Sequence, residues 1–268
     1  MFIDKKDFEE PCCPLKNPNA PEGIPVCRVI EKLDEYLSKA DYAAAERHLA
    51  YWLAETDIRN DEKGRLTVLN EQIGLFRKTA QEEKGKTAIN AALNAAEKAG
   101  YRGTVTCATT YINAATAYKA FGQPTKALSL YEKAREIYEE KLLPDDRRKA
   151  GLYNNTAVTL TELKKYREAG EFYSLALGVL KMNENTEGEA AVTLLNTADL
   201  YAAQNGTDDD RIPGLLEDAE KYLNTPSLPR DGGYAFICEK CAPVFDYYGY
   251  FAFAGELRKR AENIYERN

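Results

Sequence analysis

This sequence contains few of the residues on which enzymes and secreted proteins depend. Its 268 residues include one His, one Trp, two Met and six Cys. The single His is His48, and no Cys or Ser shares an evident loop with it from which a catalytic triad could form. Neither the phosphate-binding loop GxxxxGK[ST] nor the dinucleotide motif GxGxxG occurs. We therefore expect a protein that is not an enzyme and has no cofactor.

Long apolar runs and clusters of basic residues are also missing. No stretch approaches the ~20 apolar residues of a membrane span, and residues 1–10 lack the apolar core of a signal peptide. The net charge is −7, whereas binding to a phosphate backbone needs clustered Lys and Arg. Six Cys are too few for a disulfide framework in a chain of this length. These absences predict a cytoplasmic protein whose partners are neither nucleic acid nor membrane.

The residues that are abundant favour helices. Ala, Leu, Glu and Lys are frequent, and runs of β-branched residues typical of buried strands are few, which predicts an all-α fold. Helix formation should begin at about residue 26, because prolines interrupt the chain before that point. These prolines are Pro11, Pro14, Pro18, Pro21 and Pro25. We expect residues 1–25 to be a Pro-rich arm and residues 26–268 to form a helical domain.

A repeated segment organises this domain. Ala127–Ala134 is echoed 42 residues later by Ala169–Ala176, and each copy has a small residue, an aromatic four positions on and an Ala three further. That spacing puts all three on one face of a helix. Equivalent positions recur every 39 to 43 residues at Ala45, Ala88, Ala127, Ala169, Ile212 and Ala254. The sequence therefore predicts six antiparallel helix pairs that must stack, because one pair cannot bury its apolar stripe alone.

Turn and capping residues predict the helix boundaries. Asp41 and Asp145 are expected N-caps, and Gly85 is expected to separate two helices. Thr186 and Glu189 have the spacing of a capping box. The expected helix pairs cover residues 26–37 with 42–55, 62–81 with 87–98, 104–121 with 125–142, 145–163 with 166–182, two helices between 186 and 223, and 234–248 with 251–267.

Three segments resemble tetratricopeptide repeats (TPRs). They are residues 113–118 with Gly122 and Ala127, residues 153–157 with Tyr166 and Ala169, and residues 196–201. The resemblance is to the longer repeat of roughly 42 residues found in kinesin light chain and many bacterial repeat proteins. It spans about residues 26–268 and is strongest from 104 to 203. It implies a right-handed α-solenoid that binds a peptide or partner protein in a concave groove.

The resemblance also implies which residues line that groove. Asn113, Asn155 and Asn196 occupy matching places in three units. In longer-repeat relatives, Asn at such a place contacts the backbone of a bound peptide, since an amide offers both a donor and an acceptor. The alternative is that these Asn brace neighbouring helices by hydrogen bonding. The expected peptide-binding residues are Asn113, Thr116, Lys119, Asn154, Asn155, Val158, Asn196 and Asp199, with Thr109 and Thr161 beside them. A cluster of Arg and Lys that would bind an acidic carboxyl terminus is missing.

Two other interpretations compete with a binding scaffold. The first is a regulator that responds to a peptide and acts through a partner protein, similar to bacterial peptide-pheromone receptors built from such repeats. The second is a metal-dependent assembly module, in which Cys238 and Cys241, spaced as CxxC, meet the amino-terminal Cys of another chain. Against zinc, this pair lies within a predicted helix without the usual ligand-presenting turn, so both residues are expected to be buried thiols.

The aromatic-rich stretch 245–253 leaves one further question open. It contains Phe245, Tyr247, Tyr248, Tyr250, Phe251 and Phe253. These side chains either cover the last helix pair internally or pair with a second copy to form a homo-oligomer.

Overall fold

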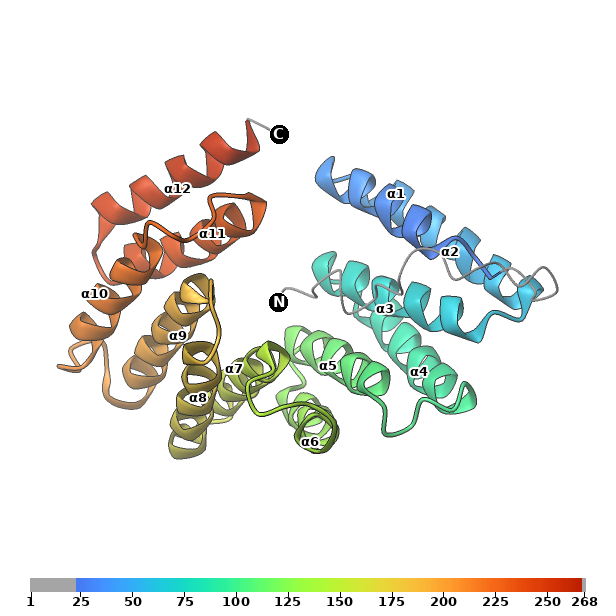
Figure 1. Cartoon of the computed structure of the whole chain (residues 1–268), viewed down its shortest axis with the longest axis horizontal. Coiled ribbons are helices and arrows are strands. Elements are labelled where there is room, and N and C mark those ends of the chain that lie inside the picture. The colour runs from blue at the N-terminus through green and yellow to red at the C-terminus, as the bar shows by residue number, and fades with distance from the viewer. Residues whose placement is uncertain (1–22, 267–268) are drawn as a thin grey trace. The chain divides into compact units, whose positions relative to one another are not determined.

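The computed structural model describes residues 23–266, and within this range all regular structure is helical. Twelve α-helices follow one another in this part of the chain and pack in sequential pairs, which confirms the all-α repeat architecture (Figure 1). The internal contacts divide the chain into two units, residues 1–123 and residues 124–268. The predicted Pro-rich arm, apart from residues 23–25, lies outside the described residues.

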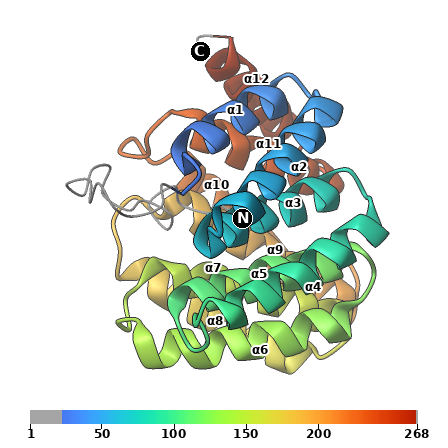
Figure 2. The ribbon, with the colours of Figure 1, turned by 90° about the vertical axis from the view of Figure 1, so that its right-hand side faces the viewer.

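The described part of the first unit contains five helices, which are labelled in Figure 2. They are α1 (Val26–Ser38), α2 (Tyr42–Arg59), α3 (Glu62–Lys78), α4 (Glu82–Lys98) and α5 (Val105–Ala120). Three begin at a capping side chain that accepts a backbone N–H: Asp41 at α2, Asp61 at α3 and Thr104 at α5. Helix α3 packs against α2, α4 and α5, so it is the centre of this unit.

The core of the first unit reaches beyond the predicted start of the domain. Ile24 is 6% exposed and packs with Leu33 and Leu49. Its backbone N–H donates to Asp61 Oδ2 at 2.8 Å, while Oδ1 of the same carboxylate caps α3. One acidic side chain therefore ties the chain before α1 to the start of α3.

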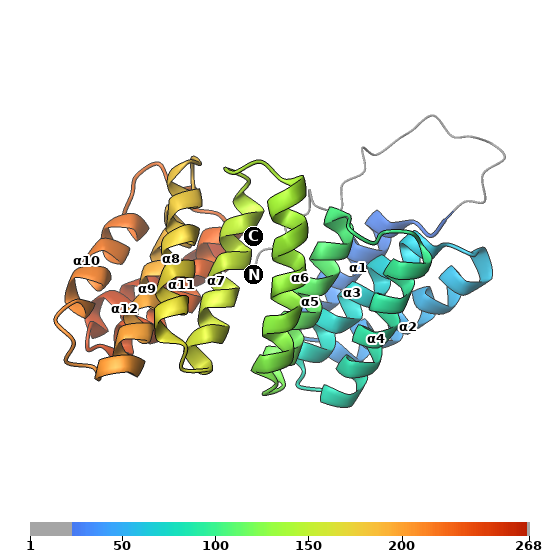
Figure 3. The same cartoon turned by 90° about the horizontal axis from the view of Figure 1, so that it is seen from below.

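Within residues 124–266 of the second unit there are seven helices, which are labelled in Figure 3. They are α6 (Pro124–Lys141), α7 (Arg147–Glu162), α8 (Tyr166–Lys181), α9 (Glu187–Asn205), α10 (Ile212–Leu223), α11 (Gly232–Tyr247) and α12 (Phe251–Tyr265). Helix α9 packs against α7 and α11 as well as against α8 and α10. The helices α7, α9 and α11 thus form a row, as the stacking of repeats requires.

The repeated small residues are the close-packing points of both units. Ala45, Ala127, Ala169 and Ala254 are fully buried, and Ala88 and Ile212 are at most 3% exposed. The Tyr side chains of the same stripe are also core residues, with Tyr131 and Tyr173 at most 2% exposed. The spacing of 39 to 43 residues between these small residues therefore marks where the second helix of each pair packs closely in the core.

Several predicted details are wrong. Gly85 does not separate two helices but lies within α4, where a Cβ would be 2.6 Å from the ring of Phe121. The N-cap of α7 is Asp146 rather than Asp145. Thr186 forms no capping box, because its hydroxyl donates backwards to Leu180 and Asn183 carbonyls. Local motifs predicted that a helix starts nearby, whereas tertiary contacts decided which atoms are paired.

The aromatic stretch 245–253 divides into buried and exposed members. Phe245 and Phe253 are buried, with ring centroids 4.8 Å apart in an edge-to-face contact. Tyr247 and Phe251 are exposed. The stretch therefore covers the α11–α12 pair internally through only part of its aromatic surface. Among the described helices, none combines the length and the apolar character needed to span a bilayer.

Candidate functional site

Five of the predicted site residues lie on α7 and α9, which pack side by side in the second unit (Figure 1). We call this surface the α7–α9 face. It consists of Asn154, Asn155 and Val158 on α7 and of Asn196 and Asp199 on α9. The first four are half-buried and Asp199 is exposed. The face is therefore accessible yet built on two helices with fixed positions.

An amide pair bridges the two helices of this face. Asn196 Nδ2 donates to Asn154 Oδ1 at 3.1 Å. In the described part of the chain, the Asn154 amide nitrogen, the Asn196 carbonyl oxygen and both polar atoms of Asn155 make no hydrogen bond. None of these atoms is a buried unsatisfied group, so each is open to solvent or to a ligand. The face thus combines unpaired donors and unpaired acceptors, which is what the backbone of an extended peptide needs.

The bridge joins a different Asn of α7 from the one that the repeat spacing predicts. The repeat spacing matches Asn196 with Asn155, but Asn196 is hydrogen-bonded to Asn154, 42 residues away. Bracing and ligand contact were posed as alternatives for these Asn residues. Asn154 and Asn196 brace the helices with one polar atom each and keep the other free, whereas Asn155 braces nothing in the described structure.

Asp199 carries the negative charge of the α7–α9 face. Tyr248, the C-cap residue of α11, donates its hydroxyl to Asp199 Oδ1 at 2.9 Å. Burial raises the pKa of Asp199 above its usual value, and the Tyr248 hydrogen bond only partly opposes this effect. The pKa values of Tyr248 and Tyr173 are raised, first by burial and then by the nearby Asp199 charge. Tyr248 therefore holds one oxygen of a carboxylate whose residue is otherwise exposed.

The remaining predicted residues lie in the first unit, on α5. We call the surface formed by Asn70 of α3 with Asn113, Thr116 and Lys119 of α5 the α3–α5 face. Asn113 is 8% exposed, and its Nδ2 donates to Asn70 Oδ1 at 3.0 Å. The Thr116 hydroxyl donates to the Ile112 carbonyl of its own helix, and Lys119 is half-exposed. The eight predicted residues therefore belong to two faces, one in each unit.

Asn70 is a bracing residue that the sequence analysis missed. It is 5% exposed, and its amide nitrogen donates to the Leu66 carbonyl at 3.0 Å and to Thr110 Oγ1 at 3.2 Å. Together with the bond from Asn113, it makes three hydrogen bonds. The signal that could have found it is the repeat itself, because Asn70 precedes Asn113 by 43 residues.

Glu71 is the second residue that the sequence did not reveal. It follows Asn70 on α3, is half-buried, and forms no hydrogen bond or ion pair with the described residues. Burial, followed by the charge of Asp34 on α1, raises its pKa to about 7. An acid in this state is partly protonated near neutral pH, and no sequence motif would have indicated it.

The residues considered for other chemistry are accounted for by packing. Cys238 and Cys241 are at most 1% exposed within α11, and burial raises the pKa of both thiols, that of Cys241 to about 12. This environment disfavours the thiolate that zinc or redox chemistry uses. His48 is half-buried, and its Nε2 lies 2.9 Å from the Val29 carbonyl oxygen. No cluster of three or more His, Cys, Asp or Glu suited to a metal occurs within residues 23–266.

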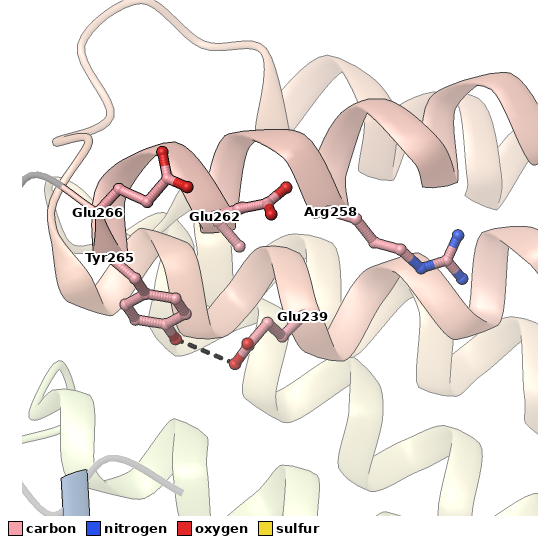
Figure 4. A pocket seen from close by; sticks show the side chains of 6 residues that line it. Glu239, Arg258, Glu262, Tyr265 and Glu266 are labelled. Atoms are coloured by element: carbon pink, nitrogen blue, oxygen red, sulfur yellow. Dashed lines mark hydrogen bonds between the residues drawn. The ribbon is translucent and has the colours of Figure 1, made fainter. Parts of the chain in front are cut away.

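A shallow cleft lies elsewhere in the second unit, on α11 and α12 (Figure 4). Its volume is about 510 Å³. The Tyr265 hydroxyl donates to Glu239 Oε2 at 3.0 Å across it, and Arg258 is paired with Asp246. It is lined by Glu239, Arg258, Ala261, Glu262, Tyr265 and Glu266. The cleft contains no residue predicted from the sequence, and three of its polar side chains, those of Glu239, Arg258 and Tyr265, are already paired within the protein.

Helices in sequential pairs, recurring buried Ala residues and amide-bridged first helices define a TPR-like helical repeat protein, which confirms the resemblance seen in the sequence. The sequence profile of the family described as soluble NSF attachment protein, SNAP, matches residues 73–212, just over half of the chain. The chain therefore belongs to the SNAP family. No curated protein sequence matches it.

Solved structures share this fold. BtubC (BKLC) from P. vanneervenii is 21% identical with a TM-score of 0.54, covering 88% of this chain and 91% of that one. NprR in complex with its cognate peptide NprX is 17% identical with a TM-score of 0.58, covering 92% and 68%. A Podosopora anserina protein, described as a kinesin light chain with nearly identical TPR-like repeats, is 16% identical with a TM-score of 0.53, covering 76% and 96%. These likenesses concern the fold.

Proposed function

We propose that this protein is a non-catalytic binding scaffold and that its α7–α9 face binds an extended peptide segment of a partner protein. The amides of Asn154, Asn155 and Asn196 form hydrogen bonds with the peptide backbone. Val158, half-buried one turn after Asn154 on α7, provides an apolar contact for a side chain of the peptide.

One observation carries the proposal, namely the unpaired polar atoms of a braced amide pair. The bond between Asn196 and Asn154 limits the motion of both side chains, so little conformational entropy is lost when a peptide binds. Their remaining donor and acceptor match the alternating N–H and C=O groups of an extended chain. Asn155 adds a complete amide with no partner in the described structure.

The comparisons support a binding role of this kind. The NprR structure contains a cognate peptide, and the SNAP family is named for attachment to another protein. Helical repeat proteins present long surfaces built from successive units, which suits a linear segment better than a small molecule. A binding scaffold also agrees with the packing roles found for Cys238, Cys241 and His48.

The test is a selection of random linear peptides displayed on phage against the full-length protein. The affinity of a selected peptide for variants is then measured by fluorescence anisotropy. We expect Asn154→Ala, Asn155→Ala and Asn196→Ala each to weaken binding roughly two- to tenfold, the effect of losing one net hydrogen bond. Asn263→Ala is the matched control, because Asn263 is exposed on α12 and makes no hydrogen bond with the described residues.

The outcomes separate clearly. Helicity by circular dichroism should be the same in all four variants, since none of these side chains is fully buried. Failure to enrich any peptide would contradict the proposal. So would enriched peptides whose affinity is unchanged by all three substitutions on the α7–α9 face.

A further inference from the structure

Asp199 lies where it can contact a side chain of a bound peptide. It is three residues after Asn196 on α9, so the two side chains share one helix face. Asn196 is joined to Asn154, and Asp199 is joined to Tyr248 at the end of α11. A peptide backbone held by the amides therefore passes close to the carboxylate.

The charge of this carboxylate is not balanced within the described structure. Asp199 forms no ion pair there, and its Oδ2 has no hydrogen-bond donor. Two Arg residues of the second unit already form ion pairs with other carboxylates. Arg211 pairs with Asp209 and Arg258 with Asp246. The ion-pairing capacity of the Asp199 carboxylate is thus left for a ligand.

The surroundings of Asp199 make that capacity useful. Tyr248 fixes one oxygen of the carboxylate, so the side chain does not have to be ordered when a ligand arrives. The nearby Asp199 charge also raises the pKa of Tyr173, a core residue that is only 2% exposed.

We propose that the α7–α9 face is selective for peptide segments that carry a Lys or Arg, and that Asp199 binds this cationic group through Oδ2. This inference rests on the proposed function and names its class of ligand. The amides of Asn154 and Asn196 bind backbone without regard to sequence, while Asp199 supplies the selectivity. An acidic side chain at the same place is repelled by the carboxylate, and a neutral one leaves the charge unpaired.

The experiment repeats the phage selection with three forms of the full-length protein: wild type, Asp199→Asn and Asp208→Asn. The last is the matched control, because it makes the same charge change in the exposed turn between α9 and α10. We expect Lys or Arg to be enriched at one peptide position with wild type and with Asp208→Asn. With Asp199→Asn, which preserves the shape of the side chain, this enrichment should disappear.

A second measurement puts a size on the preference. Fluorescence anisotropy compares a selected peptide with the same peptide in which its basic residue is replaced by Gln. Wild type should bind the basic form roughly tenfold more tightly, as for a hydrogen bond to a charged group, and Asp199→Asn should bind both forms within about twofold. The preference of wild type should fall as salt is raised, a measurement that does not depend on any variant.

The possible failures can be distinguished. If no peptide is enriched by any form, the proposed function fails together with this inference. If peptides are enriched and need Asn154 and Asn196 but show no basic residue, or show it equally with Asp199→Asn, peptide binding stands and the role of Asp199 is refuted. A wild-type preference that does not respond to salt also refutes it.

Discussion

The sharpest test of the bracing network is the replacement of Asn70 by Ala in the first unit. Asn70 is 5% exposed and makes three hydrogen bonds, with the Leu66 carbonyl, Thr110 Oγ1 and Asn113 Nδ2. A net hydrogen bond contributes about 0.5 to 1.5 kcal/mol, and a buried group left unpaired costs more than a missing one. The Leu66 carbonyl keeps its backbone hydrogen bond within the helix when the Asn70 side chain is removed, so losing this side-chain bond costs the least stability. We expect Asn70→Ala to lower the free energy of unfolding by about 2 to 3 kcal/mol.

The fluorescence of Trp52 allows the unfolding of the first unit to be followed separately. Trp52 is the only Trp of the chain, lies on α2 and packs against the core that contains Leu33 and Leu49. Its fluorescence during urea unfolding therefore reports the first unit, while circular dichroism reports both. The matched control is Asn90→Ala, since Asn90 is exposed on α4 of the same unit and makes no hydrogen bond with the described residues.

A double-mutant cycle isolates the amide bridge from the other contacts of Asn70. Asn113→Ala should cost about 1 kcal/mol, and the double variant should be less destabilised than the sum of the singles by about 1 kcal/mol. The reasoning is refuted if Asn70→Ala unfolds at the same urea concentration as Asn90→Ala. It is also refuted if the two substitutions are additive, because the bridge would then contribute nothing to stability.

Two further predictions concern the same unit and use the same Trp52 measurement. Gly85→Ala would place a Cβ 2.6 Å from the Phe121 ring. The overpacking should lower the free energy of unfolding by about 1 to 3 kcal/mol, which outweighs the gain of about 1 kcal/mol from the higher helix propensity of Ala. At Glu71 the folded state binds a proton more tightly than the unfolded chain, since the pKa is raised from 4.5 to about 7. Wild type should therefore lose roughly 1 to 3 kcal/mol of stability as pH rises through that window, and Glu71→Gln should not.

Each of these predictions has an internal reference. Gly74→Ala on α3 is the control for Gly85, because its added Cβ meets no atom within 4 Å beyond the adjacent residues and backbone of its own helix, and it should stabilise the unit. Equal effects of the two Gly substitutions would show that Phe121 moves aside without cost. For Glu71, the free-energy difference between the Gln variant and wild type should grow between about pH 4.5 and 7 and then level off. A difference that is constant across this range would mean that Glu71 is fully hydrated.

Much of the helical architecture could be predicted because it depends on contacts that are local in the sequence. The small and aromatic residues of Ala127–Ala134 and Ala169–Ala176 share one face of a helix whatever surrounds them, and the structure buries the Ala positions as expected. The turns between helices were harder to predict from the sequence where a residue other than Gly occupies the turn position. Ala80 and Lys164 take the left-handed conformation that Gly122 takes in the pair between them.

The candidate site could be predicted only in part, because its contacts join residues about 40 positions apart. Repetition of Asn every 42 residues indicated an amide ladder, but a shift of one position decides whether Asn154 or Asn155 meets Asn196. That shift depends on how α7 and α9 are rotated when they pack. Asp199 was expected on the face from helical phase, whereas its partner Tyr248, 49 residues away, was not.

From the amino-acid sequence alone came the all-α class, the repeat and the surface on which polar side chains gather, since periodicity within one helix requires no knowledge of its neighbours. Tertiary packing alone decided which amides are paired and which are free, how Glu71 loses water, that Tyr248 holds Asp199, and that Gly85 sits against Phe121. The physical reason is that hydrogen-bond partners and hydration depend on distances between helices, and these are set only when successive pairs close on one another.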